Sequence, residues 1–417
     1  MKTFITIWLL ALASAISAPL AAQPAPTKPE LVGISSVRLK RVDAFMERLQ
    51  AEGKLAGAVT LVARRGQLVS LKAHGFADIE NKRPMRTDDI FQIQSMTKPI
   101  ASVMVLMLLE EGRFLLGDPV AKFLPEFGDM KVAVVKSDAP DGYVLVPAER
   151  NITIHDLLTH RAGFTGLPPS NSPAELLRRK AAQSLPNNGD FTLEEYIKNL
   201  AASPLDAQPG ATFKYGPSTV VLGRLIEVIT GQTLDKALQD RIFKPLRMID
   251  TSFVVPLEKQ RRVAPAYALS AEKTLVKLPP DSLAPRFFSA GGNLWSTAAD
   301  YLRFSQMLLN GGELEGQRLL SRKSVELMTE RHVDKILVPF MPGQYFGLGV
   351  GVRKADGDSG LLGSPGTFGW SGGYNTYFRI DPQEKLIVML FTQLAFSPTN
   401  LELQSGFHNT VMQAIAD

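Results

Sequence analysis

Hydrophobic residues near the start of the chain recur with helical spacing and then give way to continuous apolar runs. Residues 36–53 repeat Val, Leu, Phe and Met largely at intervals of three and four and end in glycine, which predicts an amphipathic helix. The next segments, AGAVTLVA at 56–63 and LVSLKAHG at 68–75, are rich in strand-forming residues and are separated by the polar residues 64–67. This pattern predicts a β-hairpin directly after the first helix.

A different pattern begins at Ser95. The segment SMTKPIASVMVLMLLEEG at 95–112 is apolar almost all the way round, which is typical of a helix buried at the centre of a domain. The last third of the chain then mirrors the first. It predicts a helix between Ser296-Thr297 and Gly311-Gly312, a hairpin within 374–393 that turns at Asp381-Pro382, and a final helix near 400–416.

The middle of the chain, residues 126–284, differs from both ends because it is rich in loops, proline and asparagine. Its periodic segments predict helical pieces at 153–160, 173–183, 193–201 and 218–230. We therefore expect an α/β fold of the α+β type, in which both chain ends build one antiparallel sheet flanked by helices. The predicted domains are a discontinuous α/β domain, 36–125 and 285–417, and an inserted, mostly helical domain, 126–284.

The N-terminal residues 1–22, MKTFITIWLLALASAISAPLAA, have the organisation of an export signal. Lys2 provides the charged start, residues 4–16 the apolar stretch, and small residues the cleavage region, with a cut after Ala22 expected. The alternative is a membrane anchor, but the apolar run is shorter than the roughly 20 residues that span a bilayer. We expect an exported protein without stable membrane insertion once the signal is removed, periplasmic in a cell with an outer membrane, and a Pro-containing linker at 23–35.

Composition narrows the chemistry further. The 417 residues are 45% hydrophobic and 21% charged, with a formal net charge of +5 and no cysteine. A chain without cysteine has neither disulfides nor a thiol nucleophile. Its basic clusters, Arg64-Arg65, Arg178-Arg179-Lys180 and Arg261-Arg262, are short and are expected to be solvated faces. No nucleic-acid-binding motif accompanies them, so we expect no nucleic-acid partner.

One pentapeptide near the C-terminus suggests a nucleophile. GWSGG at 369–373 matches G-x-S-x-G, in which a serine occupies a sharp turn from a strand to a helix and is followed by an acid and a histidine. Around Ser371, however, the preceding residues are loop-like and the following residues form a strand. The one histidine that follows is His408, in the terminal helix. The context of an α/β-hydrolase is missing, and Ser371 is not expected to be the nucleophile.

Ser95 has a better environment for that role. In SMTK, Ser95 and Lys98 stand three apart, so a helix places their side chains on one face. Pro99 is tolerated only in the first turn of a helix, which places Ser95 near the N-terminus of the apolar helix. Burial and the helix dipole at that end both disfavour a cation, and so favour a neutral amine that can accept the serine proton.

Five segments resemble one family, in the same order along the chain. They are SMTKPI at 95–100, HDLLTHRAGF at 155–164, FKYGPSTVVLGRLIEVITG at 213–231, GGNLWSTAADYLRF at 291–304 and GTFGWSGGYNTYFRIDP at 366–382. Together they are similar to the serine β-lactamase/penicillin-binding-protein superfamily, and most similar to the class C β-lactamase-like esterases, the family VIII carboxylesterases. The resemblance implies a β-lactamase/D,D-peptidase-like fold and an acyl-enzyme mechanism.

The resemblance also implies roles for individual residues. Ser95 matches the nucleophile, Lys98 its partner, and Tyr215 the tyrosine of the Tyr-x-Asn motif, which would relay protons between serine, lysine and leaving group. Trp370, Ser371 and Gly372 align with the third motif, on the strand that lines the site. The backbone N–H groups of Ser95 and Gly373 would form the oxyanion hole.

The five histidines do not suggest a metal centre. His155 and His160 are five apart, which is wrong for one helical face, and the segment that holds them is structural in the resembled family. His74, His332 and His408 are isolated in the sequence. We therefore expect neither a metal nor another cofactor.

Two departures from the lactamase pattern favour an ester as substrate. Pro217 replaces the asparagine of Tyr-x-Asn, and Trp370 replaces the lysine of Lys-Thr-Gly. Neither can supply the polar contacts that a β-lactam's side chain and carboxylate require. The leading hypothesis is a carboxylesterase for small esters of short acyl chains. The alternatives are a β-lactamase or D,D-peptidase-like enzyme, an acyltransferase or amide hydrolase on the same fold, and a non-catalytic binding protein with a relic site.

Overall fold

The computed structural model describes residues 25–167, 169–186, 189–279, 286–334, 343–355, 360–396 and 402–417. The predicted export signal, residues 1–22, lies outside the described residues, as do the first two residues of the predicted linker.

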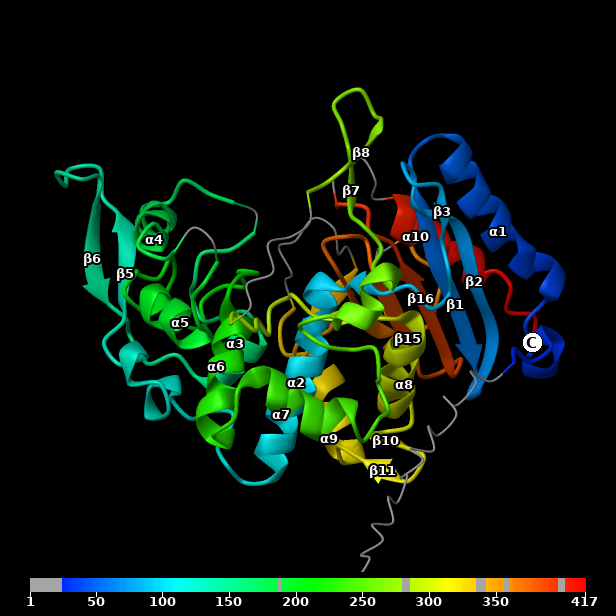
Figure 1. Ribbon diagram of the computed structural model, residues 1–417. Coiled ribbons are helices and arrows are strands. Elements are labelled where there is room, and N and C mark those ends of the chain that lie inside the picture. The colour runs from blue at the N-terminus through cyan, green and yellow to red at the C-terminus, as the bar shows by residue number, and fades with distance from the viewer. Residues whose placement is uncertain are drawn as a thin grey trace, which may run out of the picture.

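An eight-stranded sheet forms the centre of the right-hand part of the molecule in Figure 1. Its strand order is β12-β13-β14-β15-β16-β1-β2-β3, and every neighbouring pair is antiparallel. The two ends of the chain meet where β1 pairs with β16, with Val59 opposite Phe391. The predicted fold class, an antiparallel sheet built from both ends and flanked by helices, is confirmed. The strands are β1 Gly57–Arg64, β2 Gln67–Asp78, β3 Arg83–Pro84, β12 Gln344–Phe346, β13 Gly351–Arg353, β14 Phe368–Ser371, β15 Tyr377–Asp381 and β16 Leu386–Phe391.

Helices cover both faces of this sheet. The first and last helices, α1 (Ser36–Ala51) and α10 (Glu402–Met412), pack against each other and share one hydrophobic core with one face. On the other face, α8 (Ala298–Leu309) packs on β1, β15 and β16. Because helices lie on both sides, all eight residues of β1 are buried. That double burial explains why β1 reads as a continuous apolar run rather than an alternating one.

The apolar helix α2 (Thr97–Glu110) lies in the middle of the molecule, between the sheet and the helices of the central segment (Figure 1). Its residues from Thr97 to Leu108 are all buried, as the sequence predicted for a central helix. It packs against α6 (Ser218–Thr230) and joins the larger hydrophobic core. The N-terminus of α2 is therefore held at the junction of the two halves of the chain.

The helical pieces predicted in the middle of the chain are present. They are α3 Ile154–Leu158, α4 Pro173–Ala182, α5 Leu193–Ala201 and α6, and they are followed by α7 Leu234–Leu238. Thr153 and Thr192 begin α3 and α5 with capping boxes, in which the cap side chain and the third helical residue bond reciprocally. The same part of the chain also holds two hairpins that the sequence did not predict, because their strands are only three to five residues long. They are β5 Lys131–Val135 with β6 Tyr143–Pro147, and β7 Tyr267–Leu269 with β8 Leu275–Lys277.

The β7–β8 hairpin contacts the sheet side of the molecule. The Tyr267 backbone N–H donates to the carbonyl of Gln393 at 2.7 Å, and the Tyr267 carbonyl accepts from Ala395 at 2.7 Å. The Tyr267 hydroxyl donates to Glu80 at 2.6 Å. The chain thus returns to the sheet side before residue 284, where the helical domain was predicted to end. The domain boundaries stay a prediction.

Arg64 joins four separate segments at the end of the sheet. It is only 2% exposed, and its guanidinium donates to the carbonyls of Val32 and Gly33 at 2.9 and 2.8 Å. It also pairs with Glu384 at 2.5 Å and with Asp417 at 2.6 Å. The prediction of a solvated basic face is wrong for Arg64, because backbone carbonyls and two carboxylates compensate its burial.

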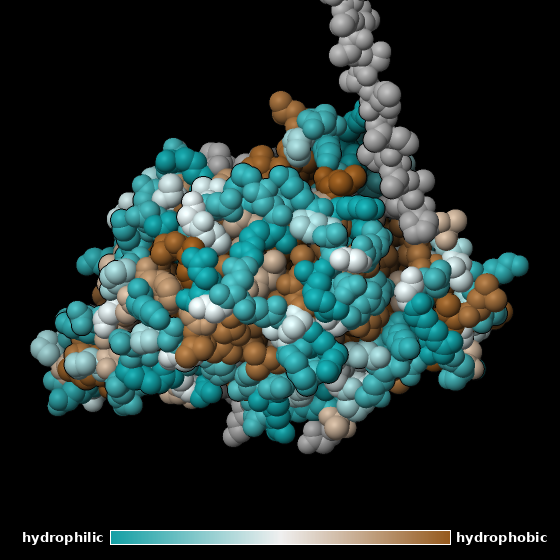
Figure 2. All heavy atoms as spheres, turned by 90° about the horizontal axis from the view of Figure 1, so that it is seen from below, coloured by the Kyte–Doolittle hydropathy of each residue, from teal (hydrophilic) through white to brown (hydrophobic). Residues whose placement is uncertain are grey.

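Polar residues cover most of the face shown in Figure 2, with apolar patches between them. No helix among the described residues is long and apolar enough to cross a membrane. The remaining strands and helices are β4 Phe91–Gln92 paired with β9 Trp295–Ser296, β10 Glu313–Leu314 paired with β11 Gln317–Arg318, α9 Arg322–Thr329, the 3₁₀ helices Pro29–Val32, Gln94–Met96, Val120–Lys122, Pro125–Phe127 and Leu257–Arg262, and a π-helical turn at Gln239–Phe243.

Candidate active site

Ser95 lies in a single 3₁₀ turn, Gln94–Met96, that leads directly into α2. Gln94, just before it, has a φ of +47°, a left-handed conformation that costs a non-glycine residue about 1–3 kcal/mol and persists only where the surroundings impose it. Here the Thr97 hydroxyl bonds the Gln94 carbonyl at 2.7 Å, and the Thr376 hydroxyl bonds the Ile93 carbonyl at 3.1 Å. The turn that presents Ser95 is thus held from both α2 and the sheet.

Lys98 is the immediate partner of Ser95. Its Nζ lies 3.0 Å from Ser95 Oγ, as their spacing on one helical face predicted. The side chain is 5% exposed, and Nζ also donates to the carbonyl of Gly291 at 2.6 Å. An amine at this distance can take the hydroxyl proton as Ser95 attacks.

Tyr215 also lies close to Lys98. The lysine Nζ is 4.7 Å from the centre of the Tyr215 ring, and the tyrosine is 8% exposed. The chain around it is held by backbone bonds, from Lys214 N–H to the His160 carbonyl and from Leu167 N–H to the Tyr215 carbonyl, both at 2.8 Å. The structure therefore brings Ser95, Lys98 and Tyr215 together from two distant segments.

The third predicted motif lies at the end of β14, where successive side chains face opposite sides of the sheet. Trp370 is 2% exposed and donates its indole N–H to the Tyr215 hydroxyl oxygen at 3.1 Å. Ser371 faces α10, and its hydroxyl donates to Gln404 Oε1 at 2.8 Å. Trp370 thus belongs to the site by direct contact. The hydroxyl of Ser371 is bonded to the terminal helix, so any contact of Ser371 with substrate would come from its backbone. The predicted role of Ser371 in substrate binding stays a prediction.

The two glycines after Ser371 bring the strand end close to the turn of Ser95. A Cβ atom on Gly372 would lie 2.4 Å from the Ile93 carbonyl oxygen, so only glycine fits there. A Cβ on Gly373 would meet nothing closer than the Gln94 side chain, at 3.8 Å. Gly373 is therefore a neighbour of the residue that precedes Ser95. Its N–H, paired with that of Ser95, remains the predicted oxyanion hole.

A cavity of about 390 Å³ opens beside these groups. Ser95 is not itself one of the lining residues, but Gln94 and Lys98, on either side of it, are. The walls come from the loop after α3, from α4 and α5, from the Tyr215 segment and from residues 289–293. They consist of Gln94, Lys98, Thr165, Gly166, Leu167, Pro169, Glu175, Arg178, Tyr196, Tyr215, Gly216, Pro217, Val220, Ser289, Gly291, Gly292 and Asn293.

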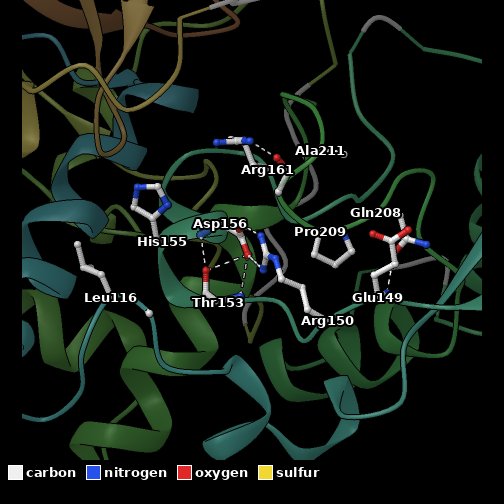
Figure 3. A pocket seen from close by; sticks show the side chains of 12 residues that line it. Leu116, Glu149, Arg150, Thr153, His155, Asp156, Arg161, Gln208, Pro209 and Ala211 are labelled. Carbon is white, nitrogen blue, oxygen red and sulfur yellow. Dashed lines mark hydrogen bonds and ion pairs between the residues drawn. The ribbon is translucent and has the colours of Figure 1, made fainter.

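A larger groove of about 630 Å³ lies elsewhere and has no nucleophile of this kind (Figure 3). Asp156 in its wall accepts hydrogen bonds from Arg150 at 2.6 and 2.9 Å and from the Thr153 hydroxyl at 2.8 Å. Burial alone would raise the pKa of Asp156, but the hydrogen bonds from Arg150 and Thr153 lower it overall. These groups satisfy one another and stabilise the start of α3, so the smaller cavity beside Lys98 is the candidate site.

The histidines are placed by packing. His160 is 1% exposed, its Nδ1 accepts from the Gly216 N–H at 3.4 Å, and its ring lies 4.7 Å from that of Tyr215. Burial, reinforced by the charge of Lys98, lowers the pKa of His160 well below its ordinary value. His332, isolated in the sequence, contacts His155 at 3.0 Å. Among the described residues, no three His, Cys, Asp or Glu side chains gather as a metal site would require.

Comparison with known proteins identifies the family. The family model described as Beta-lactamase matches residues 42–405. The chain belongs to the beta-lactamase family. It is a serine hydrolase of that superfamily, as the resemblance of its five segments implied.

Relatives within the beta-lactamase family include esterases. The chain is 38% identical over 355 residues to an uncharacterized protein of Mycobacterium tuberculosis, covering 82% of this chain and 86% of that protein. It is 29% identical over 375 residues to esterase EstB of Burkholderia gladioli, covering 85% and 90%. The solved structure of EstCE1, described as a hydrolase with promiscuous acyltransferase activity, superposes with a TM-score of 0.75 at 28% identity and covers 91% of this chain and 99% of that one. These likenesses support an ester hydrolase on this fold.

Proposed function

We propose that the protein is a carboxylesterase that hydrolyses short-chain esters through an acyl-enzyme on Ser95. The observation that carries the proposal is the contact of 3.0 Å between Lys98 Nζ and Ser95 Oγ, with Tyr215 against the same amine. Ser95 Oγ attacks the ester carbonyl and forms a C–O bond while its proton passes to Lys98. The oxyanion is held by the N–H groups of Ser95 and Gly373.

The second half of the reaction uses the same groups. The proton returns to the departing alcohol oxygen through Tyr215, and the C–O bond to the alcohol breaks, leaving the acyl group on Ser95. A water molecule then attacks the acyl carbon and gives one proton to the base. The bond between the acyl carbon and Ser95 Oγ breaks, the base returns the proton to Ser95 Oγ, and the carboxylic acid leaves. The reaction needs no electrons from outside and consumes one water for each ester.

Two residues at the site, Pro217 and Trp370, support an ester over a β-lactam. Pro217 lines the cavity with a side chain that has no amide. Trp370 uses its one polar atom on Tyr215, so it offers the cavity no cation for a carboxylate. Two similar proteins also support an ester: one is named esterase EstB, and EstCE1 is described as a hydrolase with promiscuous acyltransferase activity.

Acyl transfer is the second candidate, because the description of EstCE1 includes promiscuous acyltransferase activity. It would use the same acyl-enzyme, with an alcohol in place of water in the second step. Penicillin-binding proteins are also among the relatives, for example one of Amycolatopsis lactamdurans that is 29% identical over 351 residues. Peptidase or lactamase activity is therefore a measurable alternative.

We also propose that the protein is exported. The support is the N-terminal sequence, with Lys2, the apolar residues 4–16 and small residues up to Ala22. Mass spectrometry of protein recovered outside the cytoplasm should find a mature N-terminus at or near Gln23. Recovery of the intact chain, with residues 1–22 still present, from the cytoplasm would contradict export.

The proposed activity is tested by turnover of three substrate types under one set of conditions: a p-nitrophenyl ester series of increasing acyl length, nitrocefin, and a peptide ending in D-Ala-D-Ala. Short-chain esters should be hydrolysed with the highest kcat/KM. A higher kcat/KM for nitrocefin or for the peptide would replace the esterase assignment by the lactamase or peptidase alternative. Addition of short alcohols then separates hydrolysis from acyl transfer, because a transferase releases a new ester rather than an acid.

A further inference from the structure

The cavity beside Lys98 has an arginine in its wall. Arg178, from α4, lines the same cavity as Lys98 and Tyr215. It belongs to the basic run Arg178-Arg179-Lys180, which the sequence analysis expected to be a solvated face. Instead, its side chain is one-third exposed (33%) and lines the cavity whose wall also holds Gln94 and Lys98, on either side of Ser95.

The guanidinium of Arg178 is fixed in place by Glu175. Its Nε donates to Glu175 Oε2 at 2.9 Å, and its Nη2 donates to Oε1 at 2.7 Å. This fork-like pairing holds the planar group in one orientation. The third nitrogen, Nη1, has no hydrogen-bond acceptor among the residues that the structure describes. Arg178 is therefore oriented by one carboxylate and still has donors for another.

The charges around Arg178 do not cancel. Glu175 is the one carboxylate among the described residues that line the cavity, and it also accepts from Arg179 Nε at 2.9 Å. The hydrogen bonds from Arg178, with those from Thr165 and Arg179, hold the pKa of Glu175 at about 2, despite its burial. One ionised carboxylate is thus shared by two arginines, which leaves a positive charge at this part of the cavity.

The rest of the wall is mostly apolar or uncharged. Leu167, Pro169, Pro217 and Val220 contribute apolar surface, and Tyr196 contributes a half-buried ring. A ligand with an apolar body and one anionic group matches such a wall, whereas a fully apolar ligand would leave the donors of Arg178 to water. Position 370, where the resembled lactamases have a cation, is tryptophan here, so Arg178 is the side chain among the described lining residues that offers a permanent positive charge.

We propose that the preferred substrates are esters that also carry a carboxylate, which Arg178 binds while the ester carbonyl lies at Ser95. This proposal rests on the proposed esterase function and names its substrate class. Such compounds include half-esters of dicarboxylic acids and acyl esters of hydroxy acids. Arg178 is a specificity-determining residue in this scheme and takes no part in the bond changes at Ser95.

The test compares charged and neutral members of matched ester pairs. Monoethyl adipate against diethyl adipate places the charge on the acyl side, and 4-acetoxybenzoate against its methyl ester places it on the alcohol side. For the wild-type protein, kcat/KM should be higher for the charged member of at least one pair. Arg178→Gln should lower that kcat/KM about tenfold or more, mainly by raising KM, while the neutral member changes less than twofold.

Two control variants separate substrate binding from support of the fold. Arg179 is the other arginine bonded to Glu175, and Arg179 does not line the cavity. Arg179→Gln should therefore retain the preference for the charged ester. Arg178→Lys keeps the charge and should recover part of the loss. The preference should also weaken as ionic strength rises, because the charge at the cavity is partly exposed to solvent.

The outcomes are distinguishable from failure of the proposed function. If wild-type protein hydrolyses neutral esters but shows no preference for charged ones in either pair, the assignment of Arg178 is wrong and the esterase function stands. If Arg178→Gln lowers the kcat/KM for charged and neutral esters equally, the residue supports the fold only. If no ester is hydrolysed at all, the proposed function itself fails.

Discussion

The indole N–H of Trp370 donates a hydrogen bond to the hydroxyl oxygen of Tyr215, with 3.1 Å between the two heavy atoms. An indole nitrogen can only donate, so the tyrosine oxygen is the acceptor and its own hydrogen is left to point elsewhere. The bond fixes the tyrosine oxygen as an acceptor, and we predict that it orients the hydroxyl for a proton relay with Ser95 and Lys98. Trp370, at the position of the lysine of Lys-Thr-Gly, would then also position the tyrosine.

Replacing Trp370 by Phe should therefore reduce catalysis while keeping an aromatic ring beside Tyr215. One neutral hydrogen bond contributes roughly 1 kcal/mol, so a fall in kcat of about five- to tenfold is expected, with KM changed little. The measurement is steady-state hydrolysis of a short p-nitrophenyl ester. Trp295→Phe, in β9, is a matched control and should leave kcat within twofold. An unchanged kcat in Trp370→Phe would show that the bond to Tyr215 has no part in the relay.

Ser95 and Ser371 should respond differently to the same substitution. Ser95→Ala removes the attacking oxygen, so activity should fall by orders of magnitude and labelling by a fluorophosphonate should disappear. Ser371→Ala removes a hydroxyl that bonds Gln404, which should cost about 1 kcal/mol of stability and at most tenfold in activity. Peptide mapping should place the fluorophosphonate on the peptide that contains SMTK. A label on Ser371 would overturn the mechanism.

The neighbouring glycines provide a steric test of the site. In Gly372→Ala the new methyl would lie 2.1 Å from Thr376 Oγ1 and 2.4 Å from the Ile93 carbonyl, so β14 and the turn of Ser95 must move apart. Activity should fall at least tenfold, and the melting temperature should fall by several degrees. Gly373→Ala has room for its methyl and keeps the backbone N–H, so it should remain folded with activity within about tenfold of wild type. Equal effects of the two substitutions would contradict the close contact of Gly372 with Thr376 and Ile93 as the cause of the loss.

Stability should depend on pH through His408. Its Nδ1 accepts from the Tyr377 hydroxyl at 2.9 Å, its Nε2 lies 2.7 Å from the Leu362 carbonyl, and burial lowers its pKa to about 4. The folded protein therefore favours the neutral ring, while the unfolded chain takes up a proton near pH 6.5. The stability that the neutral His408 ring contributes is fully present above pH 6.5 and is lost as the pH falls toward 4. The difference corresponds to roughly 3 kcal/mol.

Urea unfolding at several pH values checks this dependence. In His408→Asn, which has no titrating ring, the free energy of unfolding should be lower at pH 7 but should fall less between pH 6.5 and 4. His74→Asn, in β2, should keep most of the wild-type slope. A His408→Asn slope equal to that of wild type would show that other groups dominate the acid response.

The parts of the site that lie close in sequence were predictable, and the parts joined by tertiary packing were not. Ser95 and Lys98 follow from their spacing on a helix whose apolar sequence buries the lysine. Tyr215 was found only through the resemblance, because nothing local marks a tyrosine before a helix as catalytic. The carbonyl of Gly291 that holds Lys98 has no side-chain signal in the sequence, since any residue supplies a carbonyl.

Burial of charge was the other gap. Arginine is usually exposed, so Arg64 was expected on a solvated face, yet carbonyls and carboxylates from distant segments enclose it. The contact of His332 with His155 was also not predicted, because it joins segments far apart in the chain. The central sheet was easier to predict, since the β1–β2 and β15–β16 hairpins and the two terminal helices are local patterns that repeat at both ends.

The place of β1 between β2 and β16 has a consequence for how the protein folds. During synthesis β1 can pair with β2 at once, but its other edge waits for residues 386–391, more than 300 positions later. Until then the edge offers unpaired backbone groups on an apolar strand, which is a template for association with other chains. Closing so long a loop late makes folding slow relative to proteins of local topology. Refolding yield should therefore depend strongly on protein concentration, and assistance from chaperones should matter most before β16 is in place.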